Sequence, residues 1–243
     1  MRLVFILCLI HHFTFAQVDS ILSVPMIGVR ALGQLPGGDM VNRFGANLNA
    51  GGTFMYKTNK NWVFGFDAGY LFGKRVKEDV TKQLKTAEGF IIDNEGYAAD
   101  LRISQRGLAL QLTIGKLIPV TKRFRNSGVL INVGFGYLQH KINLYDAQQK
   151  IAALKGELKY GYDRLSNGLV ISQFVGYMIL SKNRLLNIYM GIESAQAFTK
   201  SVRKFNFDTG LADTKQRLDI LTGLKFGWIL PLYKKTPNEF YFD

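Results

Sequence analysis

Residues 62–72 read WVFGFDAGYLF, and their alternation predicts a β-strand with two unlike faces. Every second residue, starting at Trp62, is aromatic or alanine, and the residues between them are small, polar or aliphatic. A strand of a membrane-spanning barrel has this pattern, because its large apolar residues face lipid and its small or polar residues face a narrow lumen. The stretch is also long enough to cross a bilayer as a tilted strand.

Seven further amphipathic stretches follow the same design, although both faces of the sixth are mixed. The eight predicted strands are Val24–Gly33, Ala46–Lys57, Trp62–Gly73, Gly107–Ile118, Val129–His140, Leu169–Ser181, Leu186–Phe198 and Leu218–Leu230. In the last strand the alternation places Leu224 and Phe226 outward and Gly223 and Lys225 inward. Period-two patterning over so many segments predicts an all-β chain.

The connections predict the orientation of the barrel. Short polar turns surround Asn59, Arg123 and Asn183, whereas long segments cover 74–106 and 141–168. Bacterial barrels place short turns in the periplasm and long loops outside the cell. We therefore predict an eight-stranded antiparallel transmembrane β-barrel of the outer-membrane type with long extracellular loops. Helix-favouring composition at 80–87 and 147–158 is too weak to predict helices there.

The first sixteen residues have the layout of a secretory signal peptide. Arg2 precedes the apolar run Leu3–Ile10, and Thr14-Phe15-Ala16 is a small-x-small cleavage motif. We expect residues 1–16 to be removed and 17–243 to form one barrel domain with a short periplasmic tail, 234–243. The only cysteine, Cys8, lies in the signal, so the mature chain is expected to form no disulfide.

Composition favours strands over helices as the membrane-crossing elements. After residue 16 the chain has no run of about twenty apolar residues, which a transmembrane helix would need. The formal net charge is +13, and +12 once Arg2 leaves with the signal. Nucleic acid is not an expected partner for a basic protein in the cell envelope.

Five charged residues fall on the inward faces of the predicted strands. They are Arg30, Asp67, Glu193, Asp219 and Lys225. One interpretation is a proton or ion path through the lumen. We prefer a structural network, because charges removed from bulk water must be paired and eight strands enclose no open pore.

The sequence offers little for catalysis. His140 is the only histidine after the signal, and no serine or acid stands beside it at a recognisable spacing. We expect it to be a solvated residue at the rim of the barrel. We therefore predict no enzyme activity, no cofactor and no metal site, since a metal needs several His, Cys or carboxylate ligands together.

The short turns are basic and contain no carboxylate. Their cations include Lys57 and Lys60, and those proposed to bind a partner are Lys122, Arg123, Arg125, Lys182 and Arg184. We call all seven cations of these turns the basic collar, and two interpretations of it are open. They either contact anionic phospholipid head groups of the outer membrane's inner leaflet or dock a periplasmic protein.

The end of the chain supports docking. Pro231 and Pro237 cannot donate to a β-ladder, so regular pairing should end near the first of them. The tail then carries the remaining residues assigned to a partner: Lys234, Lys235, Phe240, Tyr241 and Phe242. Its three aromatics either join the girdle at the membrane surface or anchor in a pocket of the partner.

Several of these features together resemble small outer-membrane barrels of Bacteroidota. They are the signal ending Thr14-Phe15-Ala16, the Gly- and aromatic-rich strand at 64–70, and the closing segment 227–233 with its aromatic tail. Within that class, size and layout are similar to the barrel subunit of the type IX secretion system, which implies a periplasmic ring of lipoprotein and partner subunits. Accessory barrels of the outer-membrane assembly machinery and free-standing barrels share these features.

The resulting functional hypothesis is a non-enzymatic anchor or accessory subunit of an envelope secretion or assembly complex. The alternative is a free-standing barrel whose outer loops bind a surface ligand or host component. A third and weaker hypothesis is a lipid A-modifying enzyme built around His140.

Overall fold

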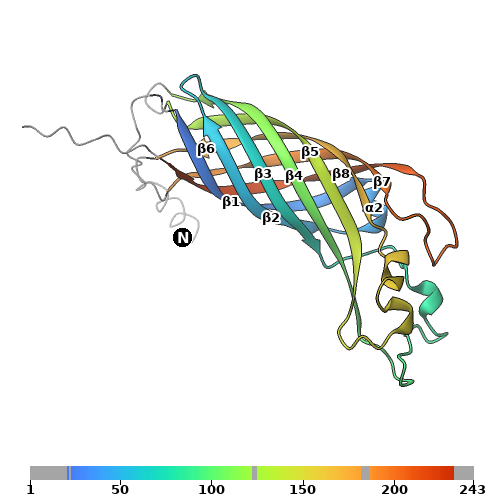
Figure 1. The fold of residues 1–243 in the computed structure, drawn as a ribbon. Helices are drawn as coiled ribbons and strands as arrows, with labels where there is room; N and C mark the ends of the chain where they lie inside the picture. The colour runs from blue at the N-terminus through green and yellow to red at the C-terminus, as the bar shows by residue number, and fades with distance from the viewer. Residues whose placement is uncertain (1–20, 22, 122–124, 182–185, 233–243) are drawn as a thin grey trace, which may run out of the picture.

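A computed structural model describes residues 21, 23–121, 125–181 and 186–232 of the 243-residue chain. Eight antiparallel strands form a closed barrel in sequence order, and β1 closes it by pairing with β8 (Figure 1). The strands are β1 (Val24–Gly38), β2 (Asn47–Lys57), β3 (Trp62–Gly73), β4 (Leu101–Pro119), β5 (Gly128–Asp146), β6 (Ser166–Ile179), β7 (Ile188–Ser201) and β8 (Gln216–Pro231). The predicted fold class is confirmed.

The register gives the strands their oblique course, which Figure 1 shows. Stepping from Gly28 through successive paired residues once around the barrel leads to Gly38, ten residues farther along β1. Such a stagger accompanies strand tilt, and with eight strands it leaves an interior that side chains fill.

The faces are arranged as the alternation predicts. On β3 the side chains of Trp62, Phe66 and Tyr70 are exposed, whereas Asp67 and Leu71 are buried. The mixed sixth strand resolves in the same way, with Val175 outside and Phe174 inside. Because the exposed face is apolar and part of the buried face is charged, the barrel is built for lipid outside and protein inside.

Several strands are longer than predicted, mainly at the end that carries the long loops. β4 begins at Leu101 instead of Gly107, and β5 ends at Asp146 instead of His140. Outside these limits the outward residues turn polar, as at Arg102 and Asn143, while the ladder continues. The predicted boundaries therefore mark the apolar band, and the hydrogen-bonded sheet extends beyond it.

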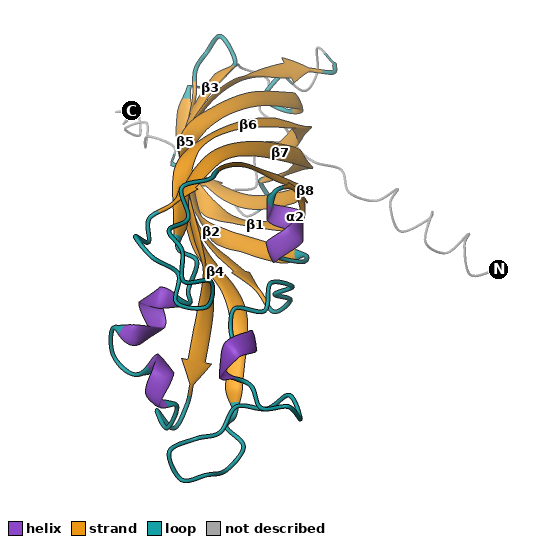
Figure 2. Ribbon diagram, turned by 90° about the vertical axis from the view of Figure 1, so that its right-hand side faces the viewer, coloured by secondary structure: helices purple, strands orange, loops and turns teal. Residues whose placement is uncertain are grey.

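The two ends of the barrel differ in their connections (Figure 2). Short turns join β2 to β3, β4 to β5 and β6 to β7, and we call this the turn end. The opposite end, the loop end, carries α2 (Met40–Arg43) and the 3₁₀ turns η2 (Lys82–Leu84), η3 (Ala152–Leu154) and η4 (Leu158–Gly161). These turns lie at or beside the two segments with helix-favouring composition. None of the helices in the described residues is long and apolar enough to cross a membrane.

The orientation predicts which segments face the cell exterior. A small epitope inserted within 94–98 should be labelled on intact cells, because this segment lies in the long connection between β3 and β4. An epitope at Asn183 should be labelled only after the outer membrane is opened. Both proteins should migrate differently in boiled and unboiled gels. Labelling of the Asn183 epitope on intact cells would reverse the orientation.

Candidate functional site

Four buried charges form one layer in the middle of the lumen. Lys225 Nζ lies 2.6 Å from Asp67 Oδ2 and 2.6 Å from Glu193 Oε2, and Arg30 Nε lies 3.5 Å from Asp67 Oδ2. Each of these side chains is at most 4% exposed. Two cations face two carboxylates, so the layer is formally neutral, as buried charges require.

Glycines on the surrounding strands make room for this layer. A Cβ added at Gly69 would lie 2.1 Å from Asn49 Oδ1 and 2.6 Å from Arg30 Nη2. At Gly227 it would lie 2.1 Å from the ring of Tyr189. All three distances are too short for real side chains, so the inward glycines of β3 and β8 allow the arginine and the tyrosine to cross the lumen.

Apolar side chains close the lumen on both sides of the charged layer. The cluster nearer the turn end takes residues from all eight strands and includes Met26, Leu117 and Ile229. The cluster nearer the loop end includes Phe44 and Ile142 and is completed by loop residues. The charged layer thus lies between two buried apolar clusters, which favours a filled core.

Removing the central cation should destabilise the barrel. Lys225→Met leaves Asp67 and Glu193 buried with only Arg30 to offset them, and should lower the free energy of unfolding by about 3–5 kcal/mol. The double variant Lys225→Met/Glu193→Gln should recover part of this loss, since one carboxylate charge is removed with the lysine. Urea unfolding in lipid vesicles measures both. Unchanged stability of the single variant would show that the layer contributes little.

Asp219 does not belong to this layer. Its Oδ2 lies 2.8 Å from His140 Nε2 and accepts a hydrogen bond of 2.6 Å from Thr199 Oγ1. Lys225 instead pairs with Asp67 and Glu193. The five inward charges therefore form two separate groups at different heights in the lumen.

The expectation of a solvated rim histidine is wrong. His140 is 1% exposed, and Phe44 packs edge-on against its ring at a centroid distance of 5.5 Å. Its partner comes from β8, which does not adjoin β5, so no spacing along the sequence could have revealed the pair. A histidine and an acid alone can orient a general base, but the other ring nitrogen, Nδ1, is buried and has no hydrogen-bond partner among the described residues. The imidazole is thus enclosed by protein in this structure.

Ion pairs fasten the loops over the lumen. Glu78 accepts from Arg43 Nε and from Arg164 Nε, both at 2.7 Å, and Arg164 also pairs with Asp208. These residues come from α2 and from the three other connections of the loop end. Burial raises the pKa of the Glu78 carboxyl, but the guanidinium groups of Arg43 and Arg164 more than offset it, so its pKa lies below the usual value. Sequence patterns gave no indication of this bridge.

The bridge should weaken in acid. Because its folded-state pKa is lowered, Glu78 stabilises the loops above its ordinary pKa of 4.5, and this contribution is lost as the pH falls through the lowered value. Hydrogen exchange of amides in 77–84, corrected for intrinsic rates, should show lower protection below about pH 4. Glu78→Gln should lower protection already at pH 7. The exposed Glu88, changed to Gln in the same loop, serves as the control, and equal effects of the two variants would contradict the bridge.

The structure describes only part of the basic collar, and one cation predicted to lie on the surface of the turn end does not lie there. Lys57 is fully buried and donates to Asn126 Oδ1 at 3.0 Å, so it closes the turn end and is not a surface cation. Lys60 and Arg125 are exposed. The other predicted partner-binding residues lie outside the described residues: Lys122, Arg123, Lys182, Arg184, Lys234, Lys235, Phe240, Tyr241 and Phe242. The predicted signal peptide, residues 1–16, does so as well.

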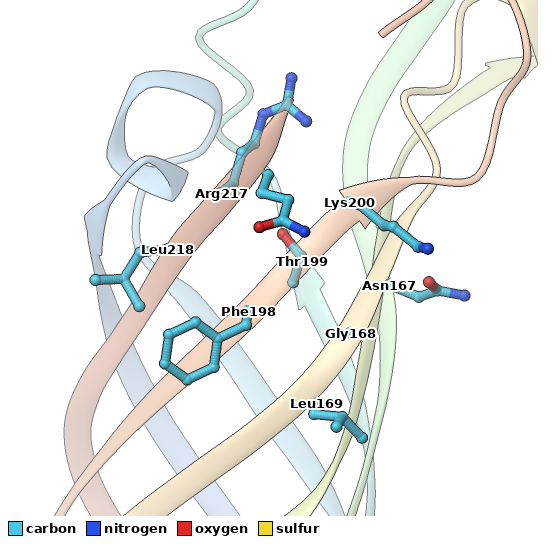
Figure 3. A pocket seen from close by; sticks show the side chains of 9 residues that line it. Asn167, Gly168, Leu169, Phe198, Thr199, Lys200, Arg217 and Leu218 are labelled. Carbon is cyan, nitrogen blue, oxygen red and sulfur yellow. The ribbon is translucent and has the colours of Figure 1, made fainter. Parts of the chain in front are cut away.

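A groove crosses the outside of β6, β7 and β8 near the loop end (Figure 3). Leu169 and Phe198 line its lower part, and Asn167 and Lys200 lie on the side toward the loops (Figure 3). At the turn end, Lys116 Nζ lies 4.7 Å from the centre of the Trp62 ring. Such aromatic and basic residues are typical of the two edges of an apolar band.

No family model and no curated protein matches this sequence. Among solved structures, surface protein A of Neisseria matches at 10% identity with a TM-score of 0.43, over 85% of this chain and 96% of that chain. Ail of Yersinia pestis matches at 11% identity and a TM-score of 0.41, over 86% and 100%. The outer membrane protein OprG of Pseudomonas aeruginosa matches at 13% identity and 0.41, over 88% and 99%. These distant likenesses say nothing of what the chain binds.

Proposed function

We propose that this protein is an outer-membrane barrel without enzyme activity that anchors a periplasmic partner at its turn end. In this role it is an accessory subunit of an envelope secretion or assembly complex. The assignment to the type IX secretion system and to Bacteroidota rests on the sequence resemblance alone.

The filled lumen is the observation that carries this proposal. Salt-bridged charges in the middle and buried apolar clusters on either side favour a filled interior over an open pore for a transported solute. The surfaces that remain for function are the two ends and the lipid-facing wall. A barrel of this kind acts through what it binds at those surfaces.

The charges of the two ends differ in a way that favours docking at the turn end. At the loop end many carboxylates are already paired with cations, as in Arg203–Asp163, Lys215–Asp39 and Lys150–Glu95. The turns contain cations and no carboxylate. Unbalanced charge of one sign attracts a partner of the opposite sign and raises its association rate.

The collar and the tail would contribute differently to docking. Exposed cations such as Lys60 and Arg125 would steer an acidic periplasmic surface toward the barrel. The aromatic residues of the tail would supply buried contact once the partner has arrived. Attraction of the same cations to phospholipid head groups is the competing explanation.

A second candidate function is ligand binding by the outer loops. It is favoured by apolar side chains exposed on them, among which Tyr97 is 70% and Leu211 is 68% exposed. Large apolar residues held out from an ordered surface are typical of binding sites. The lipid A enzyme is the weakest of the three, because His140 is enclosed.

Charge reversal tests the docking role. Lys122, Arg123 and Arg125 changed together to Glu should release a co-purifying periplasmic protein while the barrel remains heat-modifiable, and raised salt should mimic the effect. Truncation after Lys235 should instead accelerate dissociation. The readout is the set of proteins that co-purify from gently solubilised outer membranes.

The matched control reverses three exposed cations of the loop end, Lys74, Lys155 and Lys204, to Glu. It changes the net charge equally and should retain the partner. If the turn variant and the truncation both keep every co-purifying protein at the wild-type level, the collar contacts lipid and the proposal fails. Loop-mediated binding would then be the better explanation.

A further inference from the structure

Four polar side chains form a hydrogen-bonded chain on the outer wall of β6, β7 and β8. Gln173 Nε2 donates to Gln196 Oε1, Gln196 Nε2 donates to Ser194 Oγ, and the hydroxyls of Ser194 and Thr222 share a hydrogen bond. All three distances are 3.0 Å. We call these four residues the polar seam.

The seam lies within the apolar band and not at its edge. Ser194 directly follows Glu193, so the seam is on the outside of the wall that carries the charged layer inside. Exposed apolar residues flank it along the strands: Val175 is 54%, Ile192 58%, Phe198 60% and Leu224 67% exposed. Leu169 and Phe198, seen in Figure 3, separate the seam from the polar residues of the loop end.

Among the residues that the structure describes, the opposite wall has no such feature at this height. Asp67 marks the level of the charged layer on β3, and its outward neighbour Phe66 pairs with Leu112, which faces outward on β4. Leu112 pairs with Phe135 on β5, and both Phe135 and the next outward residue, Val133, are apolar and exposed. The seam is therefore confined to one side of the barrel.

Hydrocarbon chains offer no hydrogen bonds, so polar groups that face them are costly unless protein satisfies them. The hydrogen bonds within the seam satisfy only part of the donors and acceptors of its side chains. A glutamine amide has two N–H donors and an oxygen that accepts up to two bonds. Among the described residues, Gln173 uses one N–H in the seam and its Oε1 receives no hydrogen bond. One donor and one acceptor thus remain on the lipid-facing side of the barrel.

We propose that the seam is a contact between two copies of this chain in the membrane. Copies inserted in the same direction carry Gln173 at the same depth, so a two-fold axis along the membrane normal brings the two amides together without any adjustment of height. An amide is complementary to itself, because it holds a donor and an acceptor side by side. A second copy has a complementary polar group at the right depth by symmetry, whereas a different protein would have one there only if its own sequence happened to place it.

The seam and not its apolar surroundings supplies the specificity of this contact. Lipid tails are as apolar as Val175 or Leu224, so burying those residues against protein gains little over burying them in lipid. Hydrogen bonds between polar side chains and close packing drive association in a bilayer. The inference rests on the membrane-inserted state in the proposed function, but not on the docking collar.

Cross-linking of single-cysteine variants tests the contact. Cys8 is the only natural cysteine and lies in the predicted signal, so a cysteine introduced into the barrel should be the only one in the mature chain that can form a cross-link. Ile192→Cys, on the central strand of the seam, should give cross-linked dimers on oxidation of outer membranes. Phe66→Cys, on the opposite wall, is the control and should give few. Adding Gln173→Leu and Gln196→Leu should reduce the Ile192→Cys dimer at least about tenfold.

A second measurement uses the purified full-length barrel in dilute phosphatidylcholine vesicles. Single-molecule photobleaching should show two steps for the wild type and one for Gln173→Leu/Gln196→Leu. Gln139→Leu, the same change on β5 outside the seam, should retain two steps. Leucine suits a lipid-facing site, so both variants should insert and remain heat-modifiable, which is checked on the same samples.

Three results would overturn the proposal. They are a single photobleaching step for the wild type, a dimer that survives both leucine substitutions, or cross-linking of Ile192→Cys to a different protein in place of a second copy. Failure of the barrel to insert into vesicles would instead contradict the membrane role itself. Loss of the periplasmic partner would leave both measurements unchanged.

Discussion

Pairing of the backbone in a solvent without hydrogen bonds is the constraint on which this structure depends. A sheet that faces hydrocarbon can leave no edge, since each unpaired N–H or C=O costs several kcal/mol there. The pairing of β1 with β8 removes the edge, and the ten-residue stagger sets the tilt and width of the barrel. Closure at eight strands then fixes an interior so narrow that the chain must fill it with its own side chains.

Because the interior is filled with side chains, charged residues that would be solvated on a surface become buried and depend on their ion-pair partners. Lys225, Asp67, Glu193 and Arg30 are placed where each would be costly alone, and mutual pairing makes the layer tolerable. The exposed ion pairs of the loop end contribute less to stability, because a solvated ion pair contributes about 0–1 kcal/mol. Glu78 lies between these extremes: it joins two arginines under partial burial and holds separate connections in one arrangement. Removing one partner of a lumen pair is therefore expected to cost more than removing one partner of an exposed loop pair.

The sequence predicts the wall of this barrel better than its contents. Alternation within one strand is local, so WVFGFDAGYLF at 62–72 is enough to assign its two faces. Where the outward residues become polar, as at Arg102 on β4, the ladder continues but the pattern that reveals it ends. Contacts across the lumen are not local. His140 meets Asp219 from a strand that is not its neighbour, and Lys57 is buried against Asn126 from another turn, so spacing along the chain predicted neither.

Polarity has the opposite meaning on the two sides of this wall. A charge inside the barrel, such as Lys225, is stabilised by its ion-pair partner. An amide on the outside needs a different explanation, because lipid tails offer no hydrogen-bond partner. On a soluble protein Gln173 would be an unremarked surface residue. On this barrel it hydrogen-bonds to Gln196 within a band of exposed apolar residues such as Val175 and Ile192, and hydrocarbon offers no partner for the rest of its amide. With the lumen filled, the wall is thus a surface on which sequence can encode recognition, and the place where polarity interrupts the apolar band indicates where such recognition occurs.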